Sequence, residues 1–161
     1  MRRIYHHFPS TPEFEQKYNF KADLPYIVRT MAEMDGKFGT FITDSPDLKG
    51  KPIKAKRDIK VEITDKSVEF YPLNKNNVDS VLGGDIKQEG TVDFRVSLKY
   101  SFLDSKYDRI PFKGDSFIVR ANLENGILTI KVNRIDGMGR TDASRIAETI
   151  VDEIVKNAPN V

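Results

Sequence analysis

The sequence contains no cysteine, and this absence removes several kinds of chemistry. Without a thiol, the protein cannot form a disulfide, use a cysteine nucleophile or hold a metal ion through thiolate ligands. The lack of cysteine also fits a reducing compartment, where disulfides are rare.

Histidine is almost as scarce, since the adjacent pair His6 and His7 is all the sequence has. Neighbouring side chains on a strand point to opposite faces, so the pair is poorly placed to bind one metal ion. No histidine stands with a serine and a carboxylate in a triad-like grouping. The carboxylates are numerous, but no pair differs from an ordinary solvated surface. We therefore predict no metal site, no cofactor and no catalytic residue, and expect exposed or edge-strand histidines.

Long apolar runs and a dominant charge are also missing. No segment is apolar enough to span a membrane, and the first residues lack the apolar stretch of a signal peptide. The formal net charge is only +2, so no global field favours nucleic acid or a membrane. These features predict a soluble, cytoplasmic protein.

The chain has 161 residues, of which 39% are hydrophobic and 31% are charged. A domain of this size buries about 70% of the surface of its unfolded chain, which is enough for a core without disulfides or metals. No repeat or low-complexity segment divides the sequence. We therefore predict one domain over residues 1–161.

Strict alternation of apolar and polar residues marks the strands. It is clearest over residues 91–102, where one face would carry Val92, Phe94, Val96, Leu98, Tyr100 and Phe102. The next strand would bury Phe117, Val119, Ala121 and Leu123, and a third would bury Leu128, Ile130 and Val132. The Asn125-Gly126 pair between these two indicates a tight hairpin. Weaker patterns predict strands at 3–8 and 38–43 and a hairpin of 59–63 with 68–70.

Helical spacing appears in three places. Ser10 and Glu13 form a capping-box pattern that predicts a helix over roughly 11–19. Asp23 would cap a second helix, which ends before Gly36. Near the C-terminus an apolar stripe predicts a longer helix, with Thr141 as its cap and Asp142 in its first turn; the stripe comprises Ala143, Ile146, Ala147, Ile150, Ile154 and Val155. One further helical turn is expected around 78–82.

These elements define an α+β fold. We predict a curved antiparallel sheet of about six to seven strands packed on the C-terminal helix, with two short N-terminal helices at one end. Long loops are expected at 44–57 and 103–115. This order of elements resembles the helix-grip architecture of the START and birch-pollen-allergen superfamily. The resemblance implies a cavity for an apolar ligand between sheet and helix, and in some members catalysis there. The glycine-rich loop common in that superfamily is reduced here to Gly50.

The stretch RIDGMGRTDASR, residues 134–145, resembles an anion cradle because two glycines and Arg140 precede a helix. It lacks the spacing and the lysine of a phosphate-binding loop. Asp142 would repel a phosphate in the first turn, and the Thr141 hydroxyl would cap the helix. We interpret the stretch as a flexible turn and keep Arg140 as a candidate anion-binding residue.

Three classes of function remain open. The first is a non-catalytic binding module for an apolar small molecule, and its cavity candidates are Met31, Phe94, Leu98, Tyr100, Ile130, Ile146 and Ile150. The same side chains also suit a filled core. The second is a structural or assembly protein that contacts a protein partner or a second copy of itself. The third is a nucleic-acid-binding protein that uses the basic segment 49–60, with candidates Lys51, Lys54, Lys56 and Arg57. That segment is also interpreted as a loop and an edge strand protected by lysines.

Overall fold

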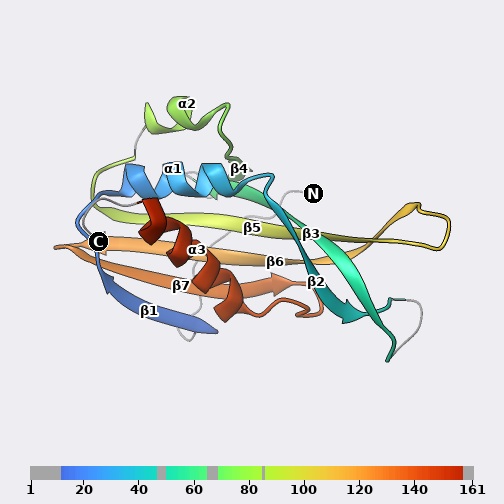
Figure 1. Ribbon diagram of the computed structural model, residues 1–161. Coiled ribbons are helices and arrows are strands. Elements are labelled where there is room, and N and C mark those ends of the chain that lie inside the picture. Colours follow the sequence, from blue (N-terminus) through green and yellow to red (C-terminus); the bar gives the residue numbers. More distant parts are fainter. Residues whose placement is uncertain (1–11, 47–49, 65–68, 85, 158–161) are drawn as a thin grey trace.

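The computed structural model describes residues 12–46, 50–64, 69–84 and 86–157. Over these residues the chain forms seven strands and three helices (Figure 1). In chain order the elements are β1 (Phe14–Asn19), α1 (Leu24–Met34), β2 (Phe38–Asp44), β3 (Pro52–Thr64), β4 (Phe70–Pro72), α2 (Val78–Leu82), β5 (Gly90–Leu103), β6 (Arg109–Glu124), β7 (Ile127–Asp136) and α3 (Ala143–Asn157).

One sheet contains all seven strands, in the order β1-β7-β6-β5-β3-β2, with β4 paired to β3. Every neighbouring pair is antiparallel. The sheet is curved, and α1 and α3 lie against its inner face (Figure 1). This arrangement confirms the predicted α+β class, a curved antiparallel sheet packed on a C-terminal helix.

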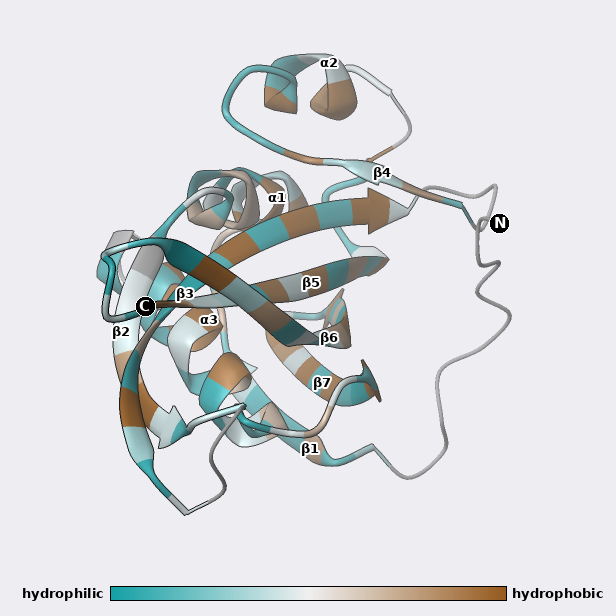
Figure 2. Cartoon of the chain, turned by 90° about the vertical axis from the view of Figure 1, so that its right-hand side faces the viewer, coloured by the Kyte–Doolittle hydropathy of each residue, from teal (hydrophilic) through white to brown (hydrophobic). Residues whose placement is uncertain are grey.

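The strands follow the alternation in the sequence. The predicted inward residues of β5 from Val92 to Tyr100 are buried, as are those of β6 and β7. Figure 2 shows the resulting change of hydropathy from residue to residue along the strands. Asn125 and Gly126 both adopt positive φ, at 53° and 76°, as a two-residue turn between right-twisted strands requires.

The first predicted helix was wrong, because residues 14–19 form β1. Phe14 and Tyr18 lie opposite Val132 and Leu128 of β7. A spacing of four residues places two side chains on one face of a helix and also on one face of a strand, so the pattern fits both. Pairing with β7 therefore overrides the local capping signal. Residues 3–8 and both histidines lie outside the described residues.

The second helix, α1, was predicted correctly. Asp23 caps it, since its Oδ1 accepts a hydrogen bond from Tyr26 N at 3.0 Å. Gly36 follows with φ +84°, which suits a glycine after a helix end. The predicted turn at 78–82 is α2.

Two predicted loops are shorter than expected. The strand β3 begins at Pro52 and the strand β6 begins at Arg109, so parts of 44–57 and 103–115 extend two long hairpins. The strand β3 also lies between β2 and β5, so it is an interior strand rather than the predicted edge strand. The correction follows from the register, because residues 52–58 of β3 pair with β2 and residues 55–64 pair with β5.

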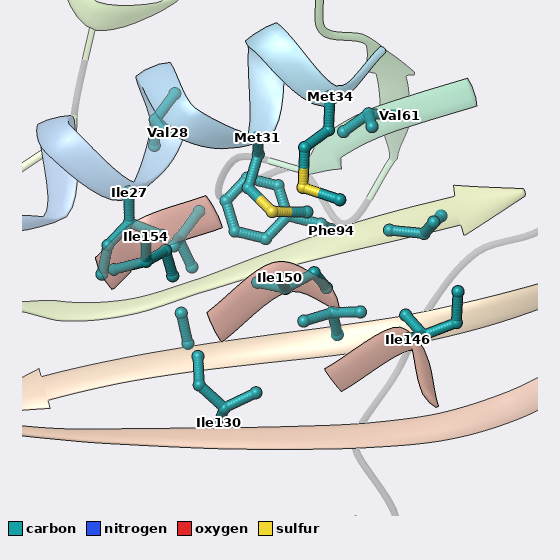
Figure 3. Packing of buried hydrophobic residues seen from close by; sticks show 14 of the residues in the cluster. Ile27, Val28, Met31, Met34, Val61, Phe94, Ile130, Ile146, Ile150 and Ile154 are labelled. Carbon is teal, nitrogen blue, oxygen red and sulfur yellow. The ribbon is translucent and has the colours of Figure 1, made fainter. Parts of the chain in front are cut away.

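The core lies between the sheet and the two helices (Figure 3). Met31 and Met34 of α1 point toward Phe94 of β5, while Ile150 of α3 lies between α1 and the sheet. The hydroxyl of Tyr26 donates to the carbonyl of Ile154 at 3.1 Å and so links α1 to α3. The predicted stripe of α3 is buried except for Val155, which is exposed. That residue was wrongly included because it sits at the border of the stripe.

Candidate functional site

A carboxyl group is buried where β6 meets the start of α3. Asp115 is 1% exposed and lies on the inner face opposite Leu98. The strand β6 has one extra residue between the pairs Leu98–Asp115 and Tyr100–Phe112, and this bulge adjusts the direction of the side chains. A side chain at the preceding Gly114 would overlap the carbonyl oxygen of Leu98. The bulge therefore requires glycine at that position.

Three donors satisfy the Asp115 carboxyl group. Gly139 N donates to Oδ1 at 2.8 Å, and Thr141 N donates to Oδ2 at 3.2 Å. The Tyr100 hydroxyl donates to Oδ2 at 2.5 Å. Backbone N–H groups of the stretch 134–145 therefore hold a carboxyl group of the same protein.

The glycines of this stretch are required by the cradle. Gly137 and Gly139 have φ of +105° and +81°, where other residues are strained. A Cβ atom at Gly137 would overlap Asp115, and one at Gly139 would overlap the Arg134 guanidinium. The interpretation of 137–141 as a flexible turn therefore needs correction, because the loop is fixed by close packing and hydrogen bonds.

The network continues from Thr141 to Arg57. The Thr141 Oγ1 lies 2.9 Å from the Tyr100 hydroxyl and accepts from Arg57 Nη1 at 2.8 Å. The expected capping role of this hydroxyl is not what the structure shows. The helix α3 begins instead at Ala143, and the Asp142 carbonyl accepts from the backbone of Arg145 and Ile146.

Burial shifts the pKa values of two side chains in this network, Tyr100 and Arg57. Desolvation, and then the hydrogen bond to Asp115, raise the pKa of Tyr100 far above its ordinary value. The phenol therefore stays protonated and remains a donor. Burial also lowers the pKa of Arg57, while the proximity of Tyr100 acts in the opposite direction. Aromatic rings enclose these groups: Phe41 lies 5.1 Å from the Tyr100 ring and 4.7 Å from the Arg57 guanidinium.

Arg140, the candidate anion-binding residue, contacts the edge of the sheet. Its Nη1 donates to Thr43 Oγ1 at 2.9 Å and to the Asp44 carbonyl at 2.7 Å, and its guanidinium lies 4.9 Å from the Phe112 ring centre. Its Nε is buried and has no partner within the described part of the chain. These contacts fasten the loop to β2, and anion binding by Arg140 stays a prediction.

The seven cavity candidates all belong to the buried cluster, namely Met31, Phe94, Leu98, Tyr100, Ile130, Ile146 and Ile150. Figure 3 shows Met31, Phe94 and Ile150 near one another between α1, α3 and the sheet. None of the seven lines the four clefts described for residues 12–157, masked positions aside. That they enclose a ligand stays a prediction.

A cleft of about 660 Å³ lies at another place, beneath α2, where β3 ends and β5 begins. Its apolar wall consists of Leu24, Tyr71, Val81, Ile86 and Val92. Thr64, Lys87, Glu89 and Asp93 supply polar groups. No sequence pattern indicated this cleft, because its wall comes from α1, β4, α2 and β5, and no periodicity encodes how these elements meet.

The basic candidates of the segment 49–60 are split by the alternation of β3. Arg57 points to the inner face and joins the buried network. Lys54 and Lys56 line a cleft of about 600 Å³ between the ends of the two long hairpins, together with Phe102 and Arg109. Lys56 also lies 3.6 Å from Asp58, and Lys51 is exposed where β3 begins. Their part in nucleic-acid binding stays a prediction.

Neither a metal-type cluster nor a membrane-spanning helix occurs among the described residues. Within them, no group of three His, Asp or Glu side chains is placed to hold a metal ion. No helix among the same residues is long and apolar enough to cross a bilayer.

The curved antiparallel sheet carries a C-terminal helix against its inner face. This arrangement is helix-grip-like. The comparisons add no particular family to this description. No protein-family model matches the chain, and comparison with curated proteins and with solved structures gives no significant match.

Proposed function

We propose that the protein is a non-catalytic binding module for a small, mostly apolar molecule, held in the cleft beneath α2. The cleft carries the proposal. Its volume of about 660 Å³ falls in the usual range of ligand sites, roughly 300–1,000 Å³, which are mostly apolar with a few polar groups. The wall and rim described above have this composition.

The weak attachment of α2 to the rest of the protein supports a binding site that can open. This helix has five residues, of which Val78 alone is fully buried. An ion pair of 2.9 Å joins Arg29 of α1 to Asp79 of α2, and both side chains are exposed. Exposed ion pairs contribute little to stability. A short cover held in this way opens at low free-energy cost, which gives an apolar ligand access.

The location beneath α2 suits a ligand better than the space beneath α3. Ligand binding needs an unfilled volume, and the residues beneath α3 pack against one another in the core. Val92 and Leu24 are buried at the base of the α2 cleft, so an apolar ligand would extend an existing apolar surface. Lys87 and Glu89 at the rim would face any polar end of the ligand.

The test uses the environment-sensitive probe anilinonaphthalenesulfonate. We expect enhanced fluorescence with the wild type and at least about a tenfold loss of affinity in Val81→Glu, because a charge in an apolar site is costly. The matched control is Val151→Glu, which changes a half-buried valine on α3 away from the cleft. Equal probe binding by both variants, or no binding by the wild type, would refute the proposal.

A second readout locates the ligand directly. The sequence has no tryptophan, so Tyr71→Trp places a single reporter in the wall of the cleft. Addition of an apolar ligand should shift its emission. An unchanged spectrum at saturating probe would place the bound probe elsewhere.

A further inference from the structure

The two long hairpins, β2–β3 and β5–β6, project beyond the helices at the same end of the molecule (Figure 1). Exposed apolar side chains gather there. Ile42 is 67% exposed on β2, Leu103 is 50% exposed at the end of β5, and Tyr107 is 84% exposed in the turn between β5 and β6. Single exposed apolar residues are ordinary, but several on two hairpins at one end of the molecule indicate a contact surface.

Positive charge is concentrated in the same two hairpins. Among the described residues, 38–46, 50–58 and 99–113 together hold eight basic and four acidic residues, whereas the other described residues hold 14 basic and 17 acidic residues. The net charge of the whole chain is therefore close to zero, although the hairpin end is basic and the other residues are on balance acidic. Local fields of this kind steer binding to anionic partners even when net charge is small.

A cleft lies between the two hairpins, where they separate from each other. The strands β3 and β5 are paired as far as Ala55 and Phe102. The cleft of about 600 Å³ begins there, with Ile53, Lys54, Leu103 and Arg109 in its wall and no acidic residue among its lining. Lys54 lies opposite Ile42 in the sheet register, so an apolar and a basic side chain stand side by side.

The conformation of Tyr107 is a separate observation. Its φ is +65°, a left-handed conformation that is unusual for a bulky residue. Its ring is too exposed for packing to offset the strain. The turn is held by Asp104, whose Oδ1 accepts from Lys106 N at 2.8 Å and from Asp108 N at 2.9 Å. Because the exposed ring on a strained backbone does not stabilise the fold, it indicates a functional role for Tyr107.

We propose that this end of the molecule, the hairpin-tip surface formed by Ile42, Lys54, Leu103, Tyr107 and Arg109, binds the surface of an anionic lipid bilayer. The apolar side chains enter the interfacial layer, and the basic ones contact the lipid headgroups. Tyrosine is enriched at membrane interfaces, and basic residues near an anionic leaflet add to binding. Nucleic acid would use the charges but gains little from exposed Ile42 and Leu103, so a bilayer fits the whole surface better.

Vesicle sedimentation tests the electrostatic part. The full chain should bind mixed phosphatidylcholine–phosphatidylserine vesicles and not pure phosphatidylcholine, with binding reduced by salt. The double variant Lys54→Glu/Arg109→Glu should weaken binding at least about tenfold. The control Lys21→Glu/Lys156→Glu makes the same charge change at exposed sites outside both hairpins and should retain binding.

A single-tryptophan pair tests the apolar part. In the tryptophan-free chain, Tyr107→Trp should show a blue shift with anionic vesicles, whereas Ile127→Trp, at the other end of the sheet, should not. Tyr107→Asn should weaken vesicle binding without loss of thermal stability, because asparagine tolerates positive φ. This separates a membrane role from a structural one.

Defined outcomes overturn the proposal. These are no sedimentation with anionic vesicles at low salt, equal binding by the two charge-reversed variants, or no shift in Tyr107→Trp. Binding of a mixed-sequence oligonucleotide without vesicle binding would reassign the surface to nucleic acid. Circular dichroism of each variant keeps a folding defect from being taken for lost binding.

Discussion

At the end of the sheet where α3 begins, the carboxyl group of Asp115 is held by buried hydrogen bonds and enclosed by aromatic rings. At the end beneath α2, the covering helix buries only Val78 and is joined to α1 by an ion pair between exposed side chains, and a cleft remains. The strands β3 and β5 run through both regions. The contrast shows that one sheet can be fixed at one end and left open at the other through the chemistry of a few contacts.

The largest expected effect comes from breaking the closed end. Asp115→Ala would leave Gly139 N, Thr141 N and the Tyr100 hydroxyl without their acceptor in a buried site. We expect a loss of about 3–5 kcal/mol in the free energy of unfolding, since each orphaned buried donor costs about 1–3 kcal/mol. Urea unfolding measures it. Asp58→Ala is the control, because the ion pair of Asp58 with Lys56 is partly exposed and should contribute under about 0.5 kcal/mol. Equal losses would contradict a special role for Asp115.

A smaller effect is expected from Tyr100→Phe, which keeps the ring and removes one donor, at a cost of about 1–2 kcal/mol. The pH dependence gives a sharper readout. Because the folded state raises the pKa of Tyr100 above the unfolded value of about 10, its contribution is complete below pH 10 and is lost as pH rises above it. Wild-type stability should therefore fall above pH 10 more steeply than that of Tyr100→Phe. The exposed Tyr107→Phe should follow the wild type, and identical slopes for all three would refute the assignment.

The smallest effect is expected at the open end. Asp79→Ala removes the exposed ion pair with Arg29 and should lower the global free energy of unfolding by less than about 0.5 kcal/mol. Amide exchange in α2 should nevertheless quicken, while that in β5 stays unchanged, because local opening is easier than global unfolding. A global loss above about 1 kcal/mol would mean that both ends are fastened with similar strength.

The elements that the sequence predicted well are those with one unambiguous period. The alternation over 91–102 and the stripe from Ala143 to Ile154 specify a sheet face and a helix face that fit each other. Residues 11–19 were wrongly predicted as a helix because the spacing of Phe14 and Tyr18 fits both the helical and the strand period. The partner that decides between them, β7, is more than a hundred residues away.

The sites were less predictable than the fold. Asp115 was missed because a polar residue among inward positions looks like an interruption of the pattern. Gly114 beside it and the glycine pair at 137 and 139 were the available signals, and only the structure joins them. The cleft beneath α2 depends on side chains from four elements, and no local pattern contains that information.

The pairing of β1 with β7 has a consequence for how the chain folds during synthesis. Glu13 N and Asn133 are hydrogen-bonded across 120 residues of sequence. The ribosome therefore releases β1 long before its partner strand and α3 exist. Contacts of such sequence separation form late and slow folding. Until then an apolar edge that includes Phe14 and Tyr18 has no native partner, so the emerging chain depends on its last quarter to become resistant to aggregation.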